Sequence, residues 1–376
     1  MKELLRSFVH AFRRLHRRLM PQRVFLVQTE PEQVARGGGL PLTEKIDFYF
    51  QDSAAKIVKI APGSLRPLFA HGPVLLYGPD RAALPRWHRL FNNGFDVNER
   101  RCATEAWSWF EARVHLEGVP DLAAARAHFD RWRASLDSGL KRVCLFGTGP
   151  SLARAIDRDW SGDLRIVCNT IVRDHALWHH LRPHAITAGD ALYHFGYTDF
   201  ARSFRRDLRA RLKETPETVF IYPDQFHSRV ALEIDIAPQR LIPVPTGRSV
   251  TVHDILVDRF ELPALGNVLN KLLLPIGCAV ARRIGLWGFD GRAPDDKLFW
   301  ANSSKHSYPE LMSTLQAAHP AFFDHFVPKA DPEQYVRSVH GDVLEHCLAS
   351  AEAAGFQVEM LHKSWTETLI CRYPDG

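Results

Sequence analysis

Short apolar segments that alternate with helical patterns constrain the fold of this chain more than any other feature. From residue 141 onward, buried-strand runs are expected at 141–146, 164–168, 185–188, 218–222, 284–287 and 357–361, with helical patterns at 267–283, 307–318 and 332–354. Parallel strands need helical crossover connections, so this order predicts an α/β fold with a Rossmann-like, doubly wound, mostly parallel sheet. Ligands of such sheets bind at the carboxyl ends of the strands. Pro275 predicts a kink in its helix.

The residues before 141 predict a smaller α/β region. Strands are expected at 23–28 and 72–77, strand pieces near 46–60, and helices at 81–91 and 119–136. This region has no residue pattern that identifies chemistry. In a chain of 376 residues, we therefore predict two domains, 23–140 and 141–376, preceded by a separate helix at 1–22.

The basic charge of the chain is concentrated in its first 23 residues. Of 48 basic and 43 acidic side chains, seven basic ones and one acidic one lie there, so the rest of the chain is close to neutral. Leu4, Phe8, Phe12, Leu15 and Leu19 recur at helical spacing, while the arginines fall mostly on the other side. This pattern predicts a helix that lies in an anionic membrane surface. A helix packed on the protein body and a mitochondrial presequence are the alternatives.

Composition excludes several classes of protein. A near-neutral body lacks the basic surface that binding to nucleic-acid phosphates requires, so no nucleic-acid partner is expected. The six cysteines are dispersed, with no Cys-x-x-Cys pair, which predicts reduced thiols in a cytoplasmic protein. No apolar run reaches the ~18 residues that a transmembrane helix needs. We therefore expect a cytoplasmic protein whose membrane contact is peripheral, on the inner face of the cytoplasmic membrane.

The strand at 141–146 runs into a glycine turn with the sequence Gly147-Thr148-Gly149-Pro150-Ser151-Leu152. Glycines permit a tight turn, and the free N–H groups of a following helix favour an anion. Leu152 replaces the third glycine of a dinucleotide fingerprint, and the next strand ends in Asn169 rather than an acid, which argues against NAD. The turn also lacks the Gly-Lys-Ser/Thr ending of a P-loop. The alternatives are a helix-capping turn for the glycines and a strand-end turn for Asn169.

Carboxylates follow several of the predicted strands. Asp290 lies at the end of the strand at 284–287, between Gly288 and Gly291, where it can act as a base or a nucleophile. Asp190 and Asp224, at two other strand ends, rank behind it. A loop-capping role for Asp290 is the alternative.

The chain after Asp290 carries polar and aromatic side chains in one segment. Residues 299–308 combine Phe299 and Trp300 with hydrogen-bonding groups, among them Ser303, Ser304, Lys305 and Tyr308. This composition predicts a loop that closes over a phosphate or a sugar; a polar surface loop is the alternative. His319 precedes Pro320 and can bind a phosphate or protonate a leaving group. Its alternative is a packed histidine without a role.

Signals for a metal are weak in the sequence. Asp157 and Asp159 have the Asp-x-Asp spacing that binds a divalent cation with sugar diphosphates. They lie at the end of the helix that follows the glycine turn, away from the strand ends. The histidines and cysteines form no cluster with zinc spacing, so the sequence predicts no metal site.

Taken together, these residues resemble a known family. The turn Gly-x-Gly-Pro-Ser-Leu after a strand, followed by a strand ending in Asn169, is similar to the nucleotide-binding half of bacterial CMP-sugar glycosyltransferases, a group that includes sialyltransferases and retaining β-Kdo transferases. The resemblance continues in Gly288-Phe289-Asp290-Gly291-Arg292, Phe299-Trp300, the Ser/Tyr-rich loop and His319-Pro320-Ala321-Phe322-Phe323. It covers roughly residues 141–325. Sialyltransferases usually have Asn in place of Thr148 and a second acid in place of Phe289, so the Kdo-type interpretation fits better.

The resemblance implies a role for each matching residue. It implies a CMP site lined by Gly147, Thr148, Gly149 and Ser151, with Asn169 on the nucleotide. Asp290 would be the catalytic carboxylate, and His319 would hold the phosphate of the departing CMP. Arg292 and Lys305 are candidates for the carboxylate of the donor. The family also implies a GT-B-like fold or a variant of it, with residues 23–140 on the side of the acceptor.

The expected activity is transfer of an ulosonic acid, most simply Kdo, from a CMP-activated donor to a surface-glycan or lipid-linked acceptor. A donor with one phosphate needs no obligatory metal, and no cofactor is expected. Two alternatives stay open. One is an enzyme like the pterin pyrophosphokinases or flagellin-glycosylation factors, which share the Gly-Pro-Ser-Leu turn. The other is a non-catalytic nucleotide-binding subunit of a glycan-assembly complex.

Overall fold

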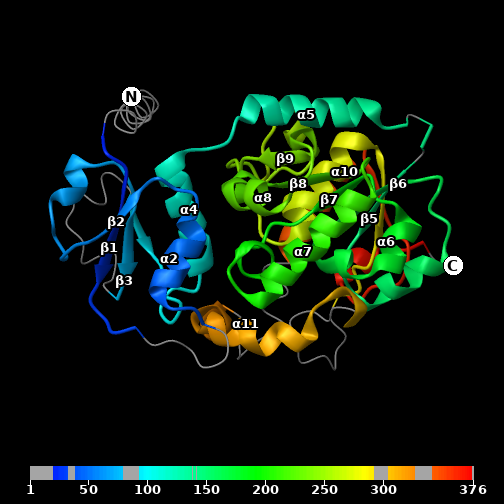
Figure 1. The fold of residues 1–376 in the computed structure, drawn as a ribbon. Helices are drawn as coiled ribbons and strands as arrows, with labels where there is room; N and C mark the ends of the chain where they lie inside the picture. Colours follow the sequence, from blue (N-terminus) through cyan, green and yellow to red (C-terminus); the bar gives the residue numbers. More distant parts are fainter. Residues whose placement is uncertain are drawn as a thin grey trace. The chain divides into compact units, whose positions relative to one another are not determined.

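The computed structural model describes residues 20–32, 39–78, 93–137, 139–140, 142–291, 304–326 and 341–374. These residues form two compact units (Figure 1). The first unit contains the described residues up to Val119 together with Thr314–Phe326, and the second contains Pro120–Ser313 and the described residues from 341 onward. The helix predicted at 1–22 and the helix predicted at 81–91 lie outside the described residues.

The first unit is built on a four-stranded parallel sheet of order β2-β1-β3-β4. Its elements are β1 (Arg23–Gln28), α2 (Leu42–Phe50), β2 (Lys56–Lys59), η1 (Arg66–Phe69), β3 (Val74–Tyr77), β4 (Gly94–Asp96) and α4 (Glu105–Glu117). The strands at 23–28 and 72–77 are confirmed, but the prediction of strand pieces over 46–60 is wrong for its first part. Leu42, Ile46 and Tyr49 recur at helical spacing, and all three are buried in α2.

The second unit is built on a seven-stranded parallel sheet of order β11-β10-β5-β6-β7-β8-β9. Its strands are β5 (Val143–Phe146), β6 (Leu164–Cys168), β7 (Ala185–Thr187), β8 (Val219–Pro223), β9 (Leu241–Val244), β10 (Arg283–Trp287) and β11 (Gln357–Met360). The prediction of an α/β fold with a parallel sheet is confirmed. The sequence analysis missed β9, which contains Pro243. A proline donates no ladder hydrogen bond, and it is accommodated here because β9 is an edge strand.

Helices and short helical turns connect these strands. In chain order they are α5 (Leu122–Ser135), η3 (Pro150–Asp157), η4 (Asn169–Arg173), α6 (His175–Leu181), η5 (Ala191–Phe195), α7 (Asp199–Glu214), η6 (Asp224–Phe226), α8 (His227–Glu233), η7 (Pro238–Arg240), α9 (Ile255–Asp258), η8 (Leu269–Leu273), α10 (Leu274–Val280), η9 (Ser304–His306), η10 (Pro309–Leu311), α11 (Met312–Ala318), η11 (Phe322–Phe326), α13 (Asp342–Ala353) and α14 (Glu367–Ile370).

The division between the units lies earlier than the predicted boundary at residue 140. Helix α5 belongs to the second unit, where it packs along β9 (Figure 1). Phe129 lies 5.8 Å from Phe260 between ring centroids, and Arg126 donates to the carbonyl of Val257 at 2.9 Å. Residues 314–326 return to the first unit. Neither feature is visible in a linear pattern, because both depend on which distant surface each helix covers.

Pro275 marks a change in helix type. The single helix predicted over 267–283 is the π-helical turn η8 followed by the α-helix α10, with Pro275 in the first turn of α10. Proline removes a backbone donor and its ring crowds the preceding turn, so a wider turn before it relieves the clash.

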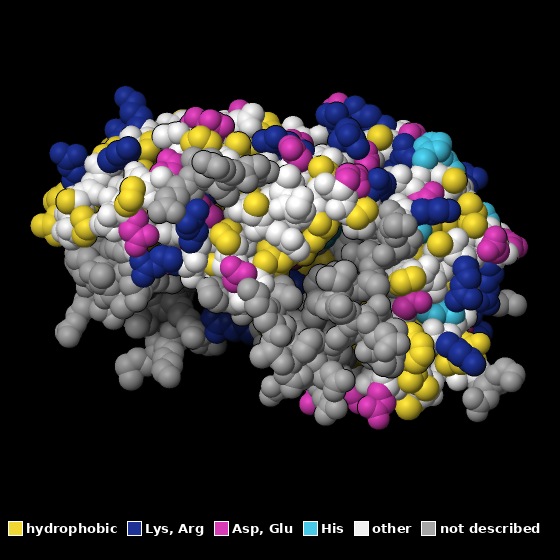
Figure 2. All heavy atoms as spheres, turned by 90° about the horizontal axis from the view of Figure 1, so that it is seen from below, with side chains coloured by type: hydrophobic (Ala, Val, Ile, Leu, Met, Phe, Trp, Pro, Cys, Tyr) yellow, Lys and Arg dark blue, Asp and Glu magenta, His cyan; other side chains and the backbone are white. Residues whose placement is uncertain are grey.

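The structure agrees with two further expectations, a body of mixed charge and reduced cysteine thiols. In the described part of the face in Figure 2, Lys and Arg side chains are interspersed with Asp and Glu. All six cysteines are free thiols. Among the described residues, no helix is both long and apolar enough to cross a membrane.

Candidate functional site

The order in which the chain adds strands to the second sheet reverses between β5 and β10. The chain runs outward from β5 through β6, β7 and β8 to β9, and then returns to β10 on the other side of β5. In open α/β sheets, ligands bind at this switch point, beyond the carboxyl ends of the strands. The glycine turn follows β5 and Asp290 follows β10, so the structure brings these two predicted features together.

The loops after β5 and β10 are joined by backbone hydrogen bonds of their glycines. The N–H of Gly147 donates to Trp287 at 2.8 Å, and the N–H of Gly149 donates to Gly288 at 2.9 Å. A Cβ at Gly147 would lie 2.6 Å from the carbonyl oxygen of Gly288, and one at Gly149 would lie 2.2 Å from Oδ2 of Asp290. Close approach of the two loops therefore requires the glycines, whether or not a nucleotide binds.

Asp290 accepts hydrogen bonds from the start of η3. The backbone N–H of Ser151 lies 3.2 Å from its Oδ1 and 3.1 Å from its Oδ2, and the Ser151 hydroxyl lies 2.9 Å from Oδ2. The carboxylate thus sits where the free N–H groups of a helical turn attract an anion. The capping role that the sequence left open is present, and the side chain of Asp290 remains partly exposed.

His362, which sequence reasoning missed, completes this cluster. Its Nδ1 lies 2.7 Å from the carbonyl of Lys363, while its Nε2 lies 2.9 Å from the N–H of Gly288 and 2.9 Å from the Ser151 hydroxyl. A carbonyl must receive a proton and an amide must give one, so the proton is assigned to Nδ1. Burial lowers the pKa of His362, against the hydrogen bond to Lys363 and the charge of Asp290, which raise it. The neutral ring follows from both observations.

The three side chains do not have the order of a nucleophilic triad. In a triad the histidine lies between the acid and the hydroxyl, whereas here Ser151 lies between Asp290 and His362. The cluster can orient the carboxylate of Asp290 and hold the neutral imidazole of His362 beside it as a hydrogen-bond acceptor. A simple signal could have revealed His362: it follows β11 directly, at the same edge of the sheet as the other candidates.

Asn169 and Asp190 occupy two other strand ends. Asn169 follows β6 with a left-handed φ of 52°, and its Oδ1 is buried without a hydrogen-bond partner among the described residues. A left-handed φ is typical of Asn in turns, the alternative that the sequence left open for this residue. Asp190 caps η5 by accepting the N–H groups of Leu192 and Tyr193 at 2.8 and 3.0 Å.

Asp224, at the end of β8, has the most perturbed carboxyl group of the strand ends. Burial raises its pKa to about 6, against backbone hydrogen bonds and the charge of Lys271, which lower it. The ordinary value is 3.8, so the charged form costs stability above about pH 6, and this cost disappears as the pH falls toward 4.

We expect Asp224→Asn to raise the free energy of unfolding at pH 7.5 by roughly 3 kcal/mol, since each unit of pKa shift is worth about 1.4 kcal/mol. The gain should shrink toward zero between pH 6 and pH 4. Denaturant titrations of both proteins across this range measure the difference. A gain that is independent of pH, or a loss of stability at pH 7.5, would contradict the prediction.

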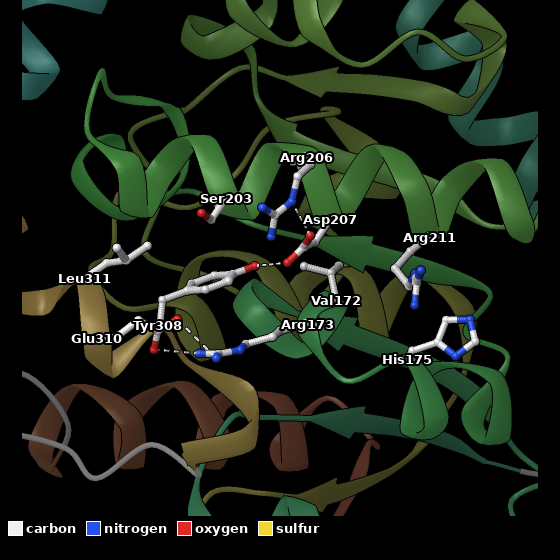
Figure 3. A pocket seen from close by; sticks show the side chains of 10 residues that line it. All are labelled: Val172, Arg173, His175, Ser203, Arg206, Asp207, Arg211, Tyr308, Glu310 and Leu311. Atoms are coloured by element: carbon white, nitrogen blue, oxygen red, sulfur yellow. Dashed lines mark hydrogen bonds and ion pairs between the residues drawn. The ribbon is translucent and has the colours of Figure 1, made fainter.

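Tyr308 lies in a groove of about 510 Å³ rather than in the Asp290 cluster (Figure 3). Its hydroxyl donates to Oδ2 of Asp207 at 2.6 Å, and the guanidinium of Arg173 lies 4.9 Å from the centre of its ring. Burial raises the pKa of Tyr308. The backbone of the same segment accepts hydrogen bonds from Thr170 and Arg173, so residues 306–308 are fastened to η4. Ser304 begins η9, and Arg292 and Ser303 lie outside the described residues.

His319 belongs to the first unit, where it is packed rather than open. Its side chain is 1% exposed, and its Nδ1 is paired with Oε1 of Glu105, itself 3% exposed. A ring buried to this extent offers no surface to a phosphate in this arrangement. The structure therefore corresponds to the packed alternative and gives no support to the predicted phosphate contact.

One of the two acids with Asp-x-Asp spacing, Asp159, has a local structural role. Oδ1 and Oδ2 of Asp159 accept the N–H and the hydroxyl of Ser161 at 2.9 and 3.0 Å, and the pair lies at the far end of η3 from the turn. The sequence analysis identified no His/Cys cluster with zinc spacing, but the structure brings together a group of side chains that could hold a metal ion. His175 and His179 lie one turn apart on α6, beside Glu214.

Comparison of the chain with protein-family models, with curated proteins and with solved structures found no match.

Proposed function

We propose that the chain is a glycosyltransferase that transfers an ulosonic acid, most simply Kdo, from a CMP-activated donor to a glycan or lipid-linked acceptor. One observation carries the proposal. The glycine turn, which contains Ser151, meets Asp290 at the switch point of a parallel sheet. Ser151 and Asp290 are 139 residues apart in the sequence. A ligand is expected at that position on physical grounds alone, and the family resemblance assigns both features to the donor site.

The chemistry required of Asp290 is compatible with its surroundings. In a retaining reaction, a carboxylate oxygen attacks the anomeric carbon while the bond to the CMP oxygen breaks, and CMP leaves with the bonding electrons. The acceptor hydroxyl then displaces the carboxylate and loses its proton. In an inverting reaction, the same carboxylate removes that proton directly. Ser151 fixes the carboxylate in either case, because both of its polar groups contact it.

The two units and the N-terminal segment have further roles in the proposal. Two α/β units with parallel sheets are compatible with a GT-B-like enzyme or a variant, in which the first unit would serve the acceptor. A single-phosphate donor needs no metal to neutralise a diphosphate. The basic helix predicted at 1–22 would hold the enzyme at the inner face of an anionic membrane, where lipid-linked acceptors are found.

A second candidate is a nucleotide-binding subunit without catalytic activity. The contacts that favour it are those between Asp290 and Ser151, since a carboxylate engaged as a helix cap has a structural role already. Such a protein would bind CMP at the same switch point and release none from a CMP-sugar.

A donor screen tests the proposal. The intact chain is incubated with CMP-Kdo and with CMP-sialic acids, and CMP release is measured. Calorimetry with CMP and with ATP·Mg²⁺ is run in parallel. We expect CMP release from CMP-Kdo and no heat of binding with ATP·Mg²⁺. Binding of CMP without release would favour the non-catalytic subunit, and binding of ATP·Mg²⁺ with AMP formation would favour a pyrophosphokinase.

A further inference from the structure

Two histidines and a glutamate converge on the surface of the second unit, on elements that the proposed glycosyl transfer does not use. His175 and His179 are four residues apart on α6, so they project from the same face of the helix. Glu214 is the last residue of α7. Their potential ligand atoms all lie within 4.8 Å of one another.

The distances match those of a metal's ligand set. Oε2 of Glu214 lies 3.0 Å from Nε2 of His179 and 3.6 Å from Nε2 of His175. A tetrahedral zinc ion with bonds of about 2.0–2.2 Å separates its ligands by about 3.4 Å. The ring centroids of the two histidines are 4.4 Å apart. Small rotations of exposed side chains would bring the three atoms into place.

The surrounding contacts orient the carboxylate. Nη2 of Arg211 donates to Oε1 of Glu214 at 2.7 Å, which leaves Oε2 directed at the imidazoles. A partner of this kind, which fixes a ligand from behind, is typical of metal centres. Without a cation, two imidazoles share one carboxylate oxygen, and exposed pairs of this type contribute little stability.

We propose that His175, His179 and Glu214 bind a divalent transition metal of the zinc class. Imidazole nitrogens suit Zn²⁺, Ni²⁺ and Cu²⁺, whereas Mg²⁺ and Ca²⁺ prefer oxygen ligands. Two histidines and one glutamate leave a fourth position open, as in catalytic zinc sites. The side chains are accessible for binding, with exposures of 64%, 43% and 34%.

One of the three proposed ligands, His175, also lines the groove that contains Tyr308. His175 and Arg211 both line this groove, and Figure 3 shows them next to each other at one end of it. The exposed side chains leave room for water to complete the coordination. The site depends on none of the residues around Asp290, so it stands or falls independently of the proposed transferase activity.

Calorimetric titration of the chelator-treated intact chain with Zn²⁺ tests the site, and Co²⁺ serves as a spectroscopic probe of the ligand geometry. We expect one strong site in the wild type, reduced at least about 100-fold in affinity by His179→Ala and by Glu214→Gln, because loss of a direct ligand costs no less than the roughly 10–100-fold typical of outer-shell partners. His180→Ala is the matched control. This histidine is the next residue of α6, but its Nε2 lies 2.8 Å from the carbonyl of Arg158, away from the cluster.

Three outcomes would overturn the proposal. They are absence of a stoichiometric site in the wild type, unchanged affinity in His179→Ala, and an equal loss in His180→Ala. Circular dichroism of each variant confirms that the exposed substitutions leave the fold intact. Mg²⁺ is titrated as a second control, because binding as strong as that of Zn²⁺ would exclude an imidazole site.

Discussion

Replacing Asp290 by asparagine is expected to lower CMP release from the preferred donor by about 10³-fold or more, which is typical for the loss of a nucleophile. Asparagine has the same size as aspartate. Its Oδ1 can still accept the N–H of Ser151, and its Nδ2 can donate to the Ser151 hydroxyl, while the second N–H contact, to Oδ2, is lost. Rates of CMP release and the midpoint of thermal unfolding, measured on the same samples, separate loss of chemistry from loss of structure.

Asp159→Asn provides the matched control for this experiment. Asp159 also accepts both the N–H and the hydroxyl of a serine, Ser161, but it lies at the far end of η3 on an exposed turn. Its substitution should leave CMP release unchanged. If Asp290→Asn turns over as fast as the wild type, Asp290 is a cap and the catalytic assignment fails. If neither the wild type nor Asp290→Asn releases CMP but both bind it, the non-catalytic alternative is favoured.

Substitution of Gly288 by alanine is expected to destabilise the second unit by about 3 kcal/mol or more. The residue has a φ of 79°, which disfavours any side chain, and a Cβ would lie 2.2 Å from the carbonyl oxygen of Gly147. Backbone atoms on both sides prevent an easy adjustment. The N–H of Gly288 also donates to His362, so the cluster around Ser151 would be displaced. Denaturant unfolding followed by tryptophan fluorescence measures the effect.

The control for this substitution is Gly162→Ala. A Cβ at Gly162 has no heavy atom within 4 Å, and the expected change is within about 0.5 kcal/mol. A similar small change in Gly288→Ala would show that the two loops move apart readily. The glycines would then owe their presence to something other than the contact between β5 and β10.

Local patterns were sufficient for most of the second sheet. The apolar runs of β5, β6, β7, β8, β10 and β11 are visible because a strand buried on both faces consists almost wholly of apolar residues. The missed strand, β9, contains Pro243, and the misassigned helix, α2, has helical periodicity over only nine residues. Both errors arise where a short segment carries two conflicting signals.

The candidate site was predicted as a set of separate residues. Gly149, Ser151 and Asp290 were identified from their positions after strands, and the structure brings them into contact. His362 was not identified, although it also follows a strand. Tyr308 and His319 were grouped with the site through the family resemblance, but one lies in the groove beside α7 and the other is buried with Glu105.

The sequence by itself determined where strands end and which side chains stand at those ends, because apolar runs, glycines and helix-starting residues act over a few neighbouring positions. Only the tertiary structure decided that β10 lies beside β5, that Asp290 therefore meets Ser151, and that His175, His179 and Glu214 share one surface. Those contacts join residues 35 to 139 positions apart. Which distant segments meet depends on the packing of the whole sheet and its helices, and no local stretch of sequence contains that information.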